Sequence, residues 1–193
     1  PHLLALTDPA ALRAAWDAFF AAARALAAAP MPVVAAMSGH APAGGCVLAL
    51  CCDYRVMARP ADPNKPYAIG MNETQVGLVA PDGIQRLLRR VVGPRQAERL
   101  LVGGLLLDSE EALHVGLVDA LAEAHAVTAQ AQQWLGTLLA LPRAPMLDTR
   151  AIARADLIEA LAPEHLDLDR LIAAWNSPDT QAGLQALAAR LRR

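Results

Sequence analysis

Apolar residues in the first seventy positions fall either at helical spacing or in short uninterrupted runs, bounded by proline, glycine and aspartate. Asp8 followed by Pro9 is typical of a helix start, and Pro30 and Pro32 follow the Ala-rich segment that it opens. Short apolar runs with β-branched residues, bounded by turn residues, predict buried strands. The expected elements are a helix over 9–28, a strand over 32–37, a helix over 44–52, a strand over 53–58 and a short strand over 67–70.

The rest of the chain carries mostly helical spacing. Asp108 and Glu111 have the spacing of a capping box, and Gly116 is a glycine of the kind that ends helices. Strands and helices therefore alternate first, and helices alone follow, which predicts an α/β fold with a helical C-terminal region. The expected helices cover 83–92, 94–102, 109–116 and 121–141, with two more after Met146 and Leu166 and a last one from Ser177 to Arg193.

Composition narrows the classes of partner. The 193 residues are 55% hydrophobic and 19% charged, which is enough apolar content for a sizeable core. A net charge of −2 lacks the basic footprint of a nucleic-acid binder, and we see no apolar run of membrane-spanning length, so we expect neither partner. Cys46, Cys51 and Cys52 are odd in number and lack zinc-site spacing, which favours reduced thiols, a cytoplasmic location and no metal.

Gly44 and Gly45 stand at the predicted start of the helix over 44–52, where a capping side chain is more usual. Two adjacent glycines let another group approach the backbone closely. That group is either a ligand at the helix N-terminus or a neighbouring strand packed tightly against the helix. The glycines by themselves favour close packing.

Glu73 is an acidic residue in the largely apolar stretch over 67–79, just after a predicted strand end. A carboxylate that is partly removed from water has a raised pKa and becomes a usable base near neutral pH. The alternative is a glutamate exposed in a surface loop. The residue types alone leave both interpretations open and favour the second.

The motifs around these residues resemble the crotonase superfamily, the enoyl-CoA hydratases and isomerases. The resemblance covers nearly the whole chain and is carried by PVVAAMSGHA at 32–41, AGGC at 43–46, LAL at 48–50, CDYRV at 52–56, IGMNE at 69–73, GLVD at 116–119 and SPD at 177–179. It implies a crotonase-like ββα spiral core over 1–120 and a helical oligomerisation region over 121–193, assembling as a homotrimer or a hexamer. It also implies further turns of the spiral ahead of the position that Pro1 matches.

By the same resemblance, Gly44 offers a backbone N–H to the enolate oxygen of an acyl-CoA thioester, and Glu73 is the acid and base. The hydratases of the family hold a water between two glutamates, and the first of these falls at Val47, which cannot exchange a proton. Coenzyme A is part of the substrate, so no separate cofactor is expected. The residues expected to bind substrate are Ala43, Gly45, Val47 and Asn72.

Asp82 leaves a second assignment open. Some isomerases of this family use an aspartate at a similar place as the base, whereas a simpler interpretation is an N-cap of the helix over 83–92. The expected function is isomerisation of 3-enoyl-CoA to 2-enoyl-CoA. The alternatives are a hydratase, a ring-acyl-CoA isomerase that involves Asp82, or a CoA-thioester-binding homologue without activity.

Overall fold

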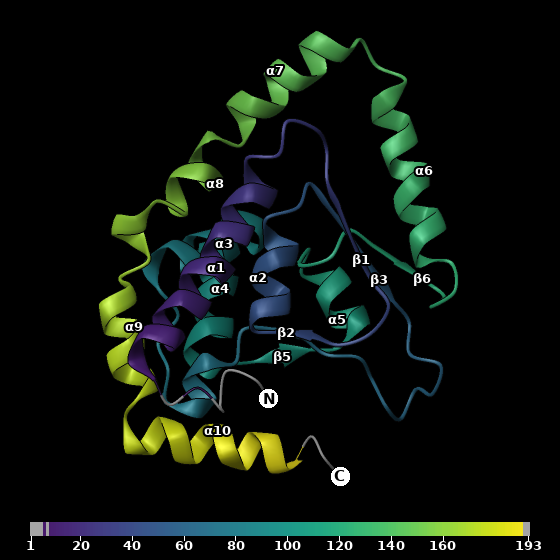
Figure 1. Ribbon diagram of the computed structural model, residues 1–193. Coiled ribbons are helices and arrows are strands. Elements are labelled where there is room, and N and C mark those ends of the chain that lie inside the picture. Colours follow the sequence, from purple (N-terminus) through teal and green to yellow (C-terminus); the bar gives the residue numbers. More distant parts are fainter. Residues whose placement is uncertain (1–5, 7, 191–193) are drawn as a thin grey trace.

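The computed structural model describes residues 6 and 8–190 and contains two three-stranded sheets (Figure 1). In the first sheet β1, β3 and β6 run parallel in that order. In the second, β2 pairs parallel with β4, and β4 pairs antiparallel with β5. The strands are β1 Val34–Met37, β2 Ala41–Pro42, β3 Tyr54–Ala58, β4 Ile69–Gly70, β5 Leu106–Leu107 and β6 Ala120–Ala122.

The core repeats the order strand, strand, helix. β1 and β2 are followed by α2 (Gly44–Leu50), and β3 and β4 are followed by the short turn η2 (Glu73–Val76) and by α3 (Asp82–Val92). Each repeat therefore adds one strand to each sheet and one helix beside them. This is the ββα spiral that the sequence predicts, and it places the start of α2 and the residues after β4 next to each other.

The capping signals in the sequence mark two helix starts correctly. In α1 (Pro9–Ala27) the Asp8 carboxylate accepts hydrogen bonds from the N–H groups of the first turn. In α5 (Ser109–His114) both bonds of the Asp108–Glu111 capping box are present. Two of the helices that lie between α1 and α5 in the chain, α3 and α4 (Pro94–Gly103), pack side by side and bury their apolar faces against the core.

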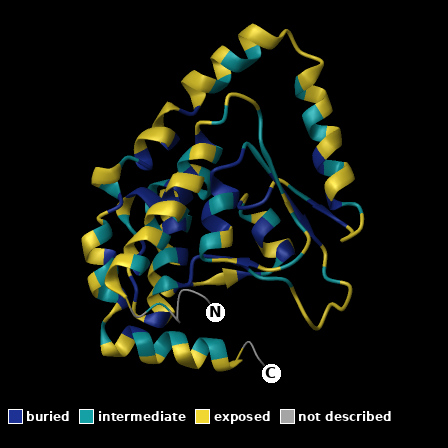
Figure 2. Cartoon of the chain, viewed as in Figure 1, coloured by how far each residue is buried: buried dark blue, intermediate teal, exposed yellow. Residues whose placement is uncertain are grey.

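The C-terminal helices run around the outside of the core. The first two, α6 and α7, extend away from it and meet at a corner, while α8, α9 and α10 return along α1 and below it (Figure 1). α7 has no buried residue, and the outer surfaces of α6 and α7 are largely exposed (Figure 2). No helix within residues 8–190 is both long and apolar enough to cross a membrane. The helices are α6 Val127–Leu139, α7 Arg143–Ala153, α8 Ala155–Ala160, α9 Leu168–Trp175 and α10 Pro178–Arg190.

Two element predictions are wrong in detail. The segment 120–122 begins no helix but forms β6, because it pairs in parallel with β3 and this pairing overrides the helical propensity of alanine and leucine. The helix that was expected over 121–141 therefore starts at Val127. The helix that was expected after Met146 starts earlier, at Arg143. Strands β2 and β5 were not expected, because two residues are too few to show a periodic pattern.

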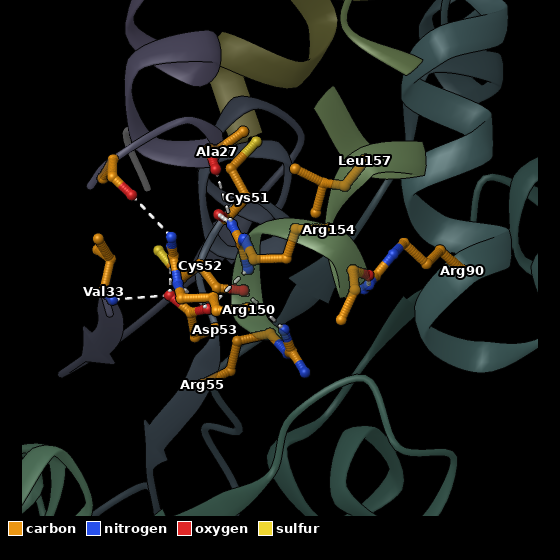
Figure 3. Close-up of polar contacts among 12 residues, drawn as sticks. Ala27, Val33, Cys51, Cys52, Asp53, Arg55, Arg90, Arg150, Arg154 and Leu157 are labelled. Carbon is orange, nitrogen blue, oxygen red and sulfur yellow. Dashed lines mark hydrogen bonds and ion pairs between the residues drawn. The ribbon is translucent and has the colours of Figure 1, made fainter. Parts of the chain in front are cut away.

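A buried ion cluster ties α7 and the start of α8 to the core (Figure 3). The Asp53 carboxylate, just before β3, accepts hydrogen bonds from Arg150 at 2.8 and 2.9 Å and from Arg154 at 3.0 Å. It also accepts one from the backbone N–H of Val33 at 2.7 Å. Arg154 donates in addition to the carbonyl oxygen of Cys51 at 2.6 Å. The cluster therefore attaches α7 and the start of α8 to the spiral core.

Candidate active site

A largely apolar cavity of about 270 Å³ lies where α1, α2, η2, α9 and α10 meet. Among the polar groups on its wall are the carboxylate of Glu73 and the amide of Asn72. Within residues 6 and 8–190, no group of three or more histidine, cysteine, aspartate or glutamate side chains forms a potential metal-ligand set. The lining residues are Trp16, Phe19, Phe20, Ala43, Gly44, Val47, Asn72, Glu73, Val76, Leu78, Ala80, Pro81, Ile84, Leu171, Trp175, Leu184 and Leu187.

The N-terminus of α2 forms one wall of the cavity. Ala43 caps the helix with φ 48° and ψ −114°, a backbone conformation that favours glycine, and its side chain makes no capping hydrogen bond. Its own N–H donates to the carbonyl oxygen of Gly70 at 2.8 Å, which fixes the turn. The N–H groups of the first helical turn have no acceptor within the helix, so the Gly44 and Gly45 amides have no intrahelical partner.

The two glycines differ in what surrounds them. A Cβ on Gly44 would lie 3.2 Å from Cε2 of Phe19, which is tighter than ordinary contact. A Cβ on Gly45 would lie 3.5 Å from that of Ala41, an ordinary distance. Gly44 therefore meets the tip of an aromatic ring of α1 inside the cavity. The tight packing of helix on strand expected from the glycine pair is therefore wrong: the close contact is at Gly44 and is made with helix α1.

Glu73 is half-buried at the start of η2, directly after the buried Asn72. Its Oε2 atom is fully buried and has no hydrogen-bond partner. Burial raises the pKa of the Glu73 carboxyl, and the residue's own backbone N–H offsets part of that rise. A carboxylate held in this way exchanges protons closer to neutral pH than an exposed glutamate does. The interpretation of Glu73 as a surface loop residue is wrong.

The other ionisable neighbours of the cavity are poor catalytic candidates. Burial and, less strongly, the Glu73 charge raise the pKa of the Cys46 thiol to about 12, so Cys46 stays a thiol at neutral pH. Val47 lies one helical turn after Gly44 and contributes an apolar surface at the place where the hydratases carry a glutamate. Among the described residues that line the cavity, Glu73 is the only one with a carboxylate.

Asp82 lies outside this cavity. It is the first residue of α3, and the N-cap position is taken by Pro81, so the N-cap interpretation of Asp82 is wrong. Its carboxylate pairs with Arg86 at 2.7 Å and Arg89 at 3.8 Å and is half exposed. The structure thus brings together Ala43, Gly44, Val47, Asn72 and Glu73 on one wall, whereas Gly45 and Asp82 do not line it.

The sequence did not single out the opposite wall. It consists of aromatic residues of α1 and apolar residues of α9 and α10. Trp16, Phe19 and Phe20 have the spacing of one helix face, but nothing in that spacing shows what the face covers. The C-terminal region was expected to serve in oligomerisation, which stays a prediction. Its last two helices line the cavity of their own chain through Leu171, Trp175, Leu184 and Leu187.

Comparison with known proteins identifies the family. The profile of the family described as enoyl-CoA hydratase/isomerase matches residues 5–192. The chain belongs to the enoyl-CoA hydratase/isomerase family. Human mitochondrial enoyl-CoA delta isomerase 1 is 35% identical over 161 residues, which are 83% of this chain and 52% of that protein. The mouse protein of the same name is 45% identical over 58% of this chain and 37% of that protein.

Solved structures of the enoyl-CoA hydratase/isomerase family show the same fold. The crystal structure of human mitochondrial Δ3-Δ2-enoyl-CoA isomerase superimposes with a TM-score of 0.86 at 33% identity, covering 98% of this chain and 72% of that one.

A hydratase is also among the proteins that are similar in sequence. The crotonyl-CoA hydratase of Syntrophomonas wolfei has 28% identity over 80% of this chain and 58% of that protein. The chain spans about half the length of the human isomerase that it matches.

Proposed function

We propose that this protein is an enoyl-CoA isomerase, which moves the double bond of a 3-enoyl-CoA to the 2-position. The observation that carries the proposal is that Glu73, whose Oε2 atom is buried without a hydrogen-bond partner, lines an apolar cavity together with the start of α2. The names of the human and mouse relatives agree with an isomerase. The Syntrophomonas wolfei relative keeps a hydratase as the second candidate.

The proposed reaction needs one carboxylate and one stabilised oxygen. Glu73 removes a proton from C2 of the 3-enoyl thioester, and the electron pair moves onto the thioester oxygen to give an enolate. The N–H of Gly44 at the start of α2 donates to that oxygen, which lowers the barrier because the donor is already in place. Glu73, now protonated, returns the proton to C4, and the double bond ends between C2 and C3. A single carboxyl group serves as base and then as acid.

Val47 favours isomerisation over hydration. Hydration of a 2-enoyl-CoA requires a water that is oriented and deprotonated while C2 is protonated, a task that the hydratases of this family divide between two glutamates. The isopropyl group of Val47 neither binds nor deprotonates water. Glu73, the one carboxylate of the cavity, is therefore expected to support isomerisation and to hydrate poorly.

The test of the proposed function is a paired assay of the intact gene product on a 3-enoyl-CoA and a 2-enoyl-CoA of equal chain length. We expect isomerisation of the first with hydration of the second slower by about a hundredfold or more, because one acid–base group contributes about that factor. Hydration at a rate comparable to isomerisation would mean that a second acid group takes part, one that is not among the described residues lining the cavity. Loss of both reactions would favour a CoA-thioester-binding homologue.

Gly44→Ala tests whether substrate approaches the start of α2. We expect kcat/KM to fall by about tenfold or more, since the new methyl group lies beside the amide that faces the enolate oxygen. The free energy of unfolding is expected to change by less than about 1 kcal/mol, because alanine favours a helix over glycine by that amount and offsets the shift of Phe19. Steady-state kinetics and urea unfolding measure the two effects.

Gly136→Ala in α6 is the matched control for this substitution. A Cβ at Gly136 meets nothing within 4 Å, and the residue does not line the cavity. The control is expected to keep full activity and to gain up to about 1 kcal/mol in stability. Equal activity of Gly44→Ala and Gly136→Ala would remove Gly44 from the proposed mechanism.

A further inference from the structure

The turn η2, which carries Glu73, is anchored on two sides. On one side the Gln75 side chain donates to the carbonyl oxygen of Gly104 at 2.8 Å, and the Thr74 hydroxyl donates to that of Leu101 at 3.3 Å. These bonds join η2 to the end of α4. On the other side η2 contacts α10. The proposed reaction uses Glu73 and leaves this second contact unexplained.

The contact between η2 and α10 brings the two backbones close together. A Cβ on Gly77, which follows η2, would lie 2.9 Å from Oγ1 and 3.4 Å from Cα of Thr180. A Cβ on Gly183, about one turn further along α10, would lie 3.1 Å from Cα of Val76. A side chain at either glycine would press against the other element. A shift of α10 therefore displaces η2 as well.

One peptide group links Thr180 of α10 to Glu73. The hydroxyl of Thr180, which is fully buried, donates to the carbonyl oxygen of Gly77 at 3.0 Å. The N–H of the same peptide group belongs to Leu78 and donates to the carbonyl oxygen of Glu73 at 2.9 Å. The peptide group between Gly77 and Leu78 is therefore held at its oxygen by α10, and it holds the backbone of Glu73 at its nitrogen.

The carboxylate of Glu73 depends on the position of this backbone. Its Oε2 atom has no hydrogen-bond partner, and the carboxylate interacts with the backbone N–H of Glu73 itself. A displacement of the turn therefore carries the carboxylate with it. Proton transfer tolerates little displacement, since misplacing a catalytic group by about 1 Å lowers the rate by up to about a hundredfold.

We propose that Thr180 is a positioning residue for Glu73, and that its hydroxyl holds η2 so that the Glu73 carboxylate faces the substrate. The proposal rests on the proposed function, because that function makes Glu73 the acid and base. Thr180 does not line the cavity and acts through the peptide group between Gly77 and Leu78. The last helix of the described chain thus orients the base in addition to covering the cavity.

Thr180→Val tests the hydroxyl, because valine has nearly the same shape and cannot donate a hydrogen bond. A methyl group needs about 3.4 Å from a carbonyl oxygen, whereas the hydroxyl lies at 3.0 Å, so η2 is pushed away from α10. We expect kcat of the intact gene product on a 3-enoyl-CoA to fall by about tenfold or more, with KM changed by less than about twofold.

Two further substitutions at Thr180 make the kinetic test independent of the added methyl group. Thr180→Ala removes the hydroxyl and adds nothing beside the Gly77 carbonyl, so we expect it to lose kcat as Thr180→Val does. Thr180→Ser keeps the hydroxyl and is expected to retain kcat within about twofold of the parent protein. Loss of kcat in Thr180→Ser equal to that in Thr180→Val would overturn the proposal.

Two controls separate positioning from a general loosening of a helix. The Oγ of Ser177 accepts from the N–H of Thr180 at 3.3 Å and donates to its hydroxyl at 2.9 Å, so Ser177→Ala weakens the start of α10 but leaves the bond to Gly77. Thr137→Val removes a hydroxyl that donates to the carbonyl oxygen of Trp134 in α6 and does not line the cavity. Both controls are expected to keep kcat. An equal loss in Ser177→Ala and Thr180→Val, or no loss in Thr180→Val, would overturn the proposal.

Titration of the Glu73 carboxyl separates this proposal from the proposed function, because it needs no substrate. The carboxyl carbon signal is assigned by its absence in Glu73→Gln and followed with pH by NMR. Burial holds the pKa of Glu73 above 4.5 in the parent protein, and the displaced turn of Thr180→Val admits water, so we expect this pKa to fall toward 4.5.

The kinetic and titration results have separate meanings. If the parent protein isomerises 3-enoyl-CoA, kcat of the Thr180 variants decides the proposal. If it does not, the proposed function fails and the titration decides: a lower pKa of Glu73 in Thr180→Val supports the positioning role, and an unchanged pKa refutes it.

Discussion

Glu73→Gln is expected to lower kcat for isomerisation of a 3-enoyl-CoA by about a thousandfold, because the amide cannot take a proton from C2 or return one to C4. Glutamine has the size and shape of glutamate, so the cavity wall is preserved. KM is expected to change much less, since substrate contacts most of the wall through the apolar side chains. Steady-state kinetics on the intact gene product measures both parameters.

Two further measurements distinguish a catalytic role of Glu73 from a structural one. Because burial raises its pKa, kcat/KM of the parent protein is expected to fall with decreasing pH along a limb that lies above the ordinary glutamate value of 4.5. Any residual activity of Glu73→Gln is expected to lack this limb. Because the pKa of Glu73 is raised in the folded protein, its ionisation lowers the stability of the fold as pH rises from the ordinary glutamate value of 4.5 to the raised pKa, and the loss is constant above that pKa. Glu73→Gln is therefore expected to be as stable as the parent protein or more stable, with the difference growing only across this pH window.

Asp82→Asn is the control variant for this prediction. Asp82 is half exposed and lies outside the cavity, in contact with Arg86 and Arg89. Its substitution is expected to leave the pH profile of the parent protein in place. A large loss of kcat in Asp82→Asn, with activity retained in Glu73→Gln, would instead support the ring-acyl-CoA isomerase alternative that assigns the base to Asp82.

Asp53→Asn is expected to lower the free energy of unfolding by about 3 kcal/mol, which is typical of removing one member of a buried ion cluster. The neutral amide leaves the guanidinium groups of Arg150 and Arg154 in a buried site without their counter-ion (Figure 3). Arg154 is only 6% exposed, and burial lowers its pKa while the Asp53 charge opposes that change, so Asp53 stabilises the buried guanidinium. Urea unfolding followed by circular dichroism measures the change.

Glu110→Gln is the matched control for the ion cluster. Glu110 pairs with Arg59 at 3.0 Å, but its side chain is 64% exposed. Solvent screens such a pair, so its loss is expected to cost less than about 1 kcal/mol. Similar costs for Asp53→Asn and Glu110→Gln would mean that the carbonyl contacts of the two arginines, with Ala29, Ala27 and Cys51, hold the outer helices without help from Asp53.

The sequence predicts the parts of this fold whose signal is local. The Asp8 and Asp108 caps, the apolar run of β1 and the amphipathic spacing of α3 depend on neighbouring residues, and the structure has each of them. The local pattern made two parts of the site conspicuous, the glycine pair at 44–45 and Glu73, a carboxylate among apolar residues. The residues alone favoured a surface loop, and only the resemblance to a known family gave it a chemical role.

The features that the sequence did not reveal depend on contacts between distant segments. Residues 120–122 have helix-forming side chains, and only their pairing with β3 makes them a strand. Trp16 and Trp175 are 159 positions apart, yet their rings meet at 5.5 Å in the same cavity wall. No periodicity relates such residues, because their proximity is set by the way the outer helices return along α1.

The same return of the C-terminal helices constrains when the protein becomes able to bind. During synthesis, Trp16, Gly44 and Glu73 leave the ribosome long before Leu171, Trp175, Leu184 and Leu187, which close the other side of the cavity. Wall contacts that join the two ends of the chain form late and fold slowly, since the intervening loop must be closed first. A nascent chain therefore exposes its aromatic face of α1 without the helices that cover it. Binding competence arrives only with the last helix of the described chain.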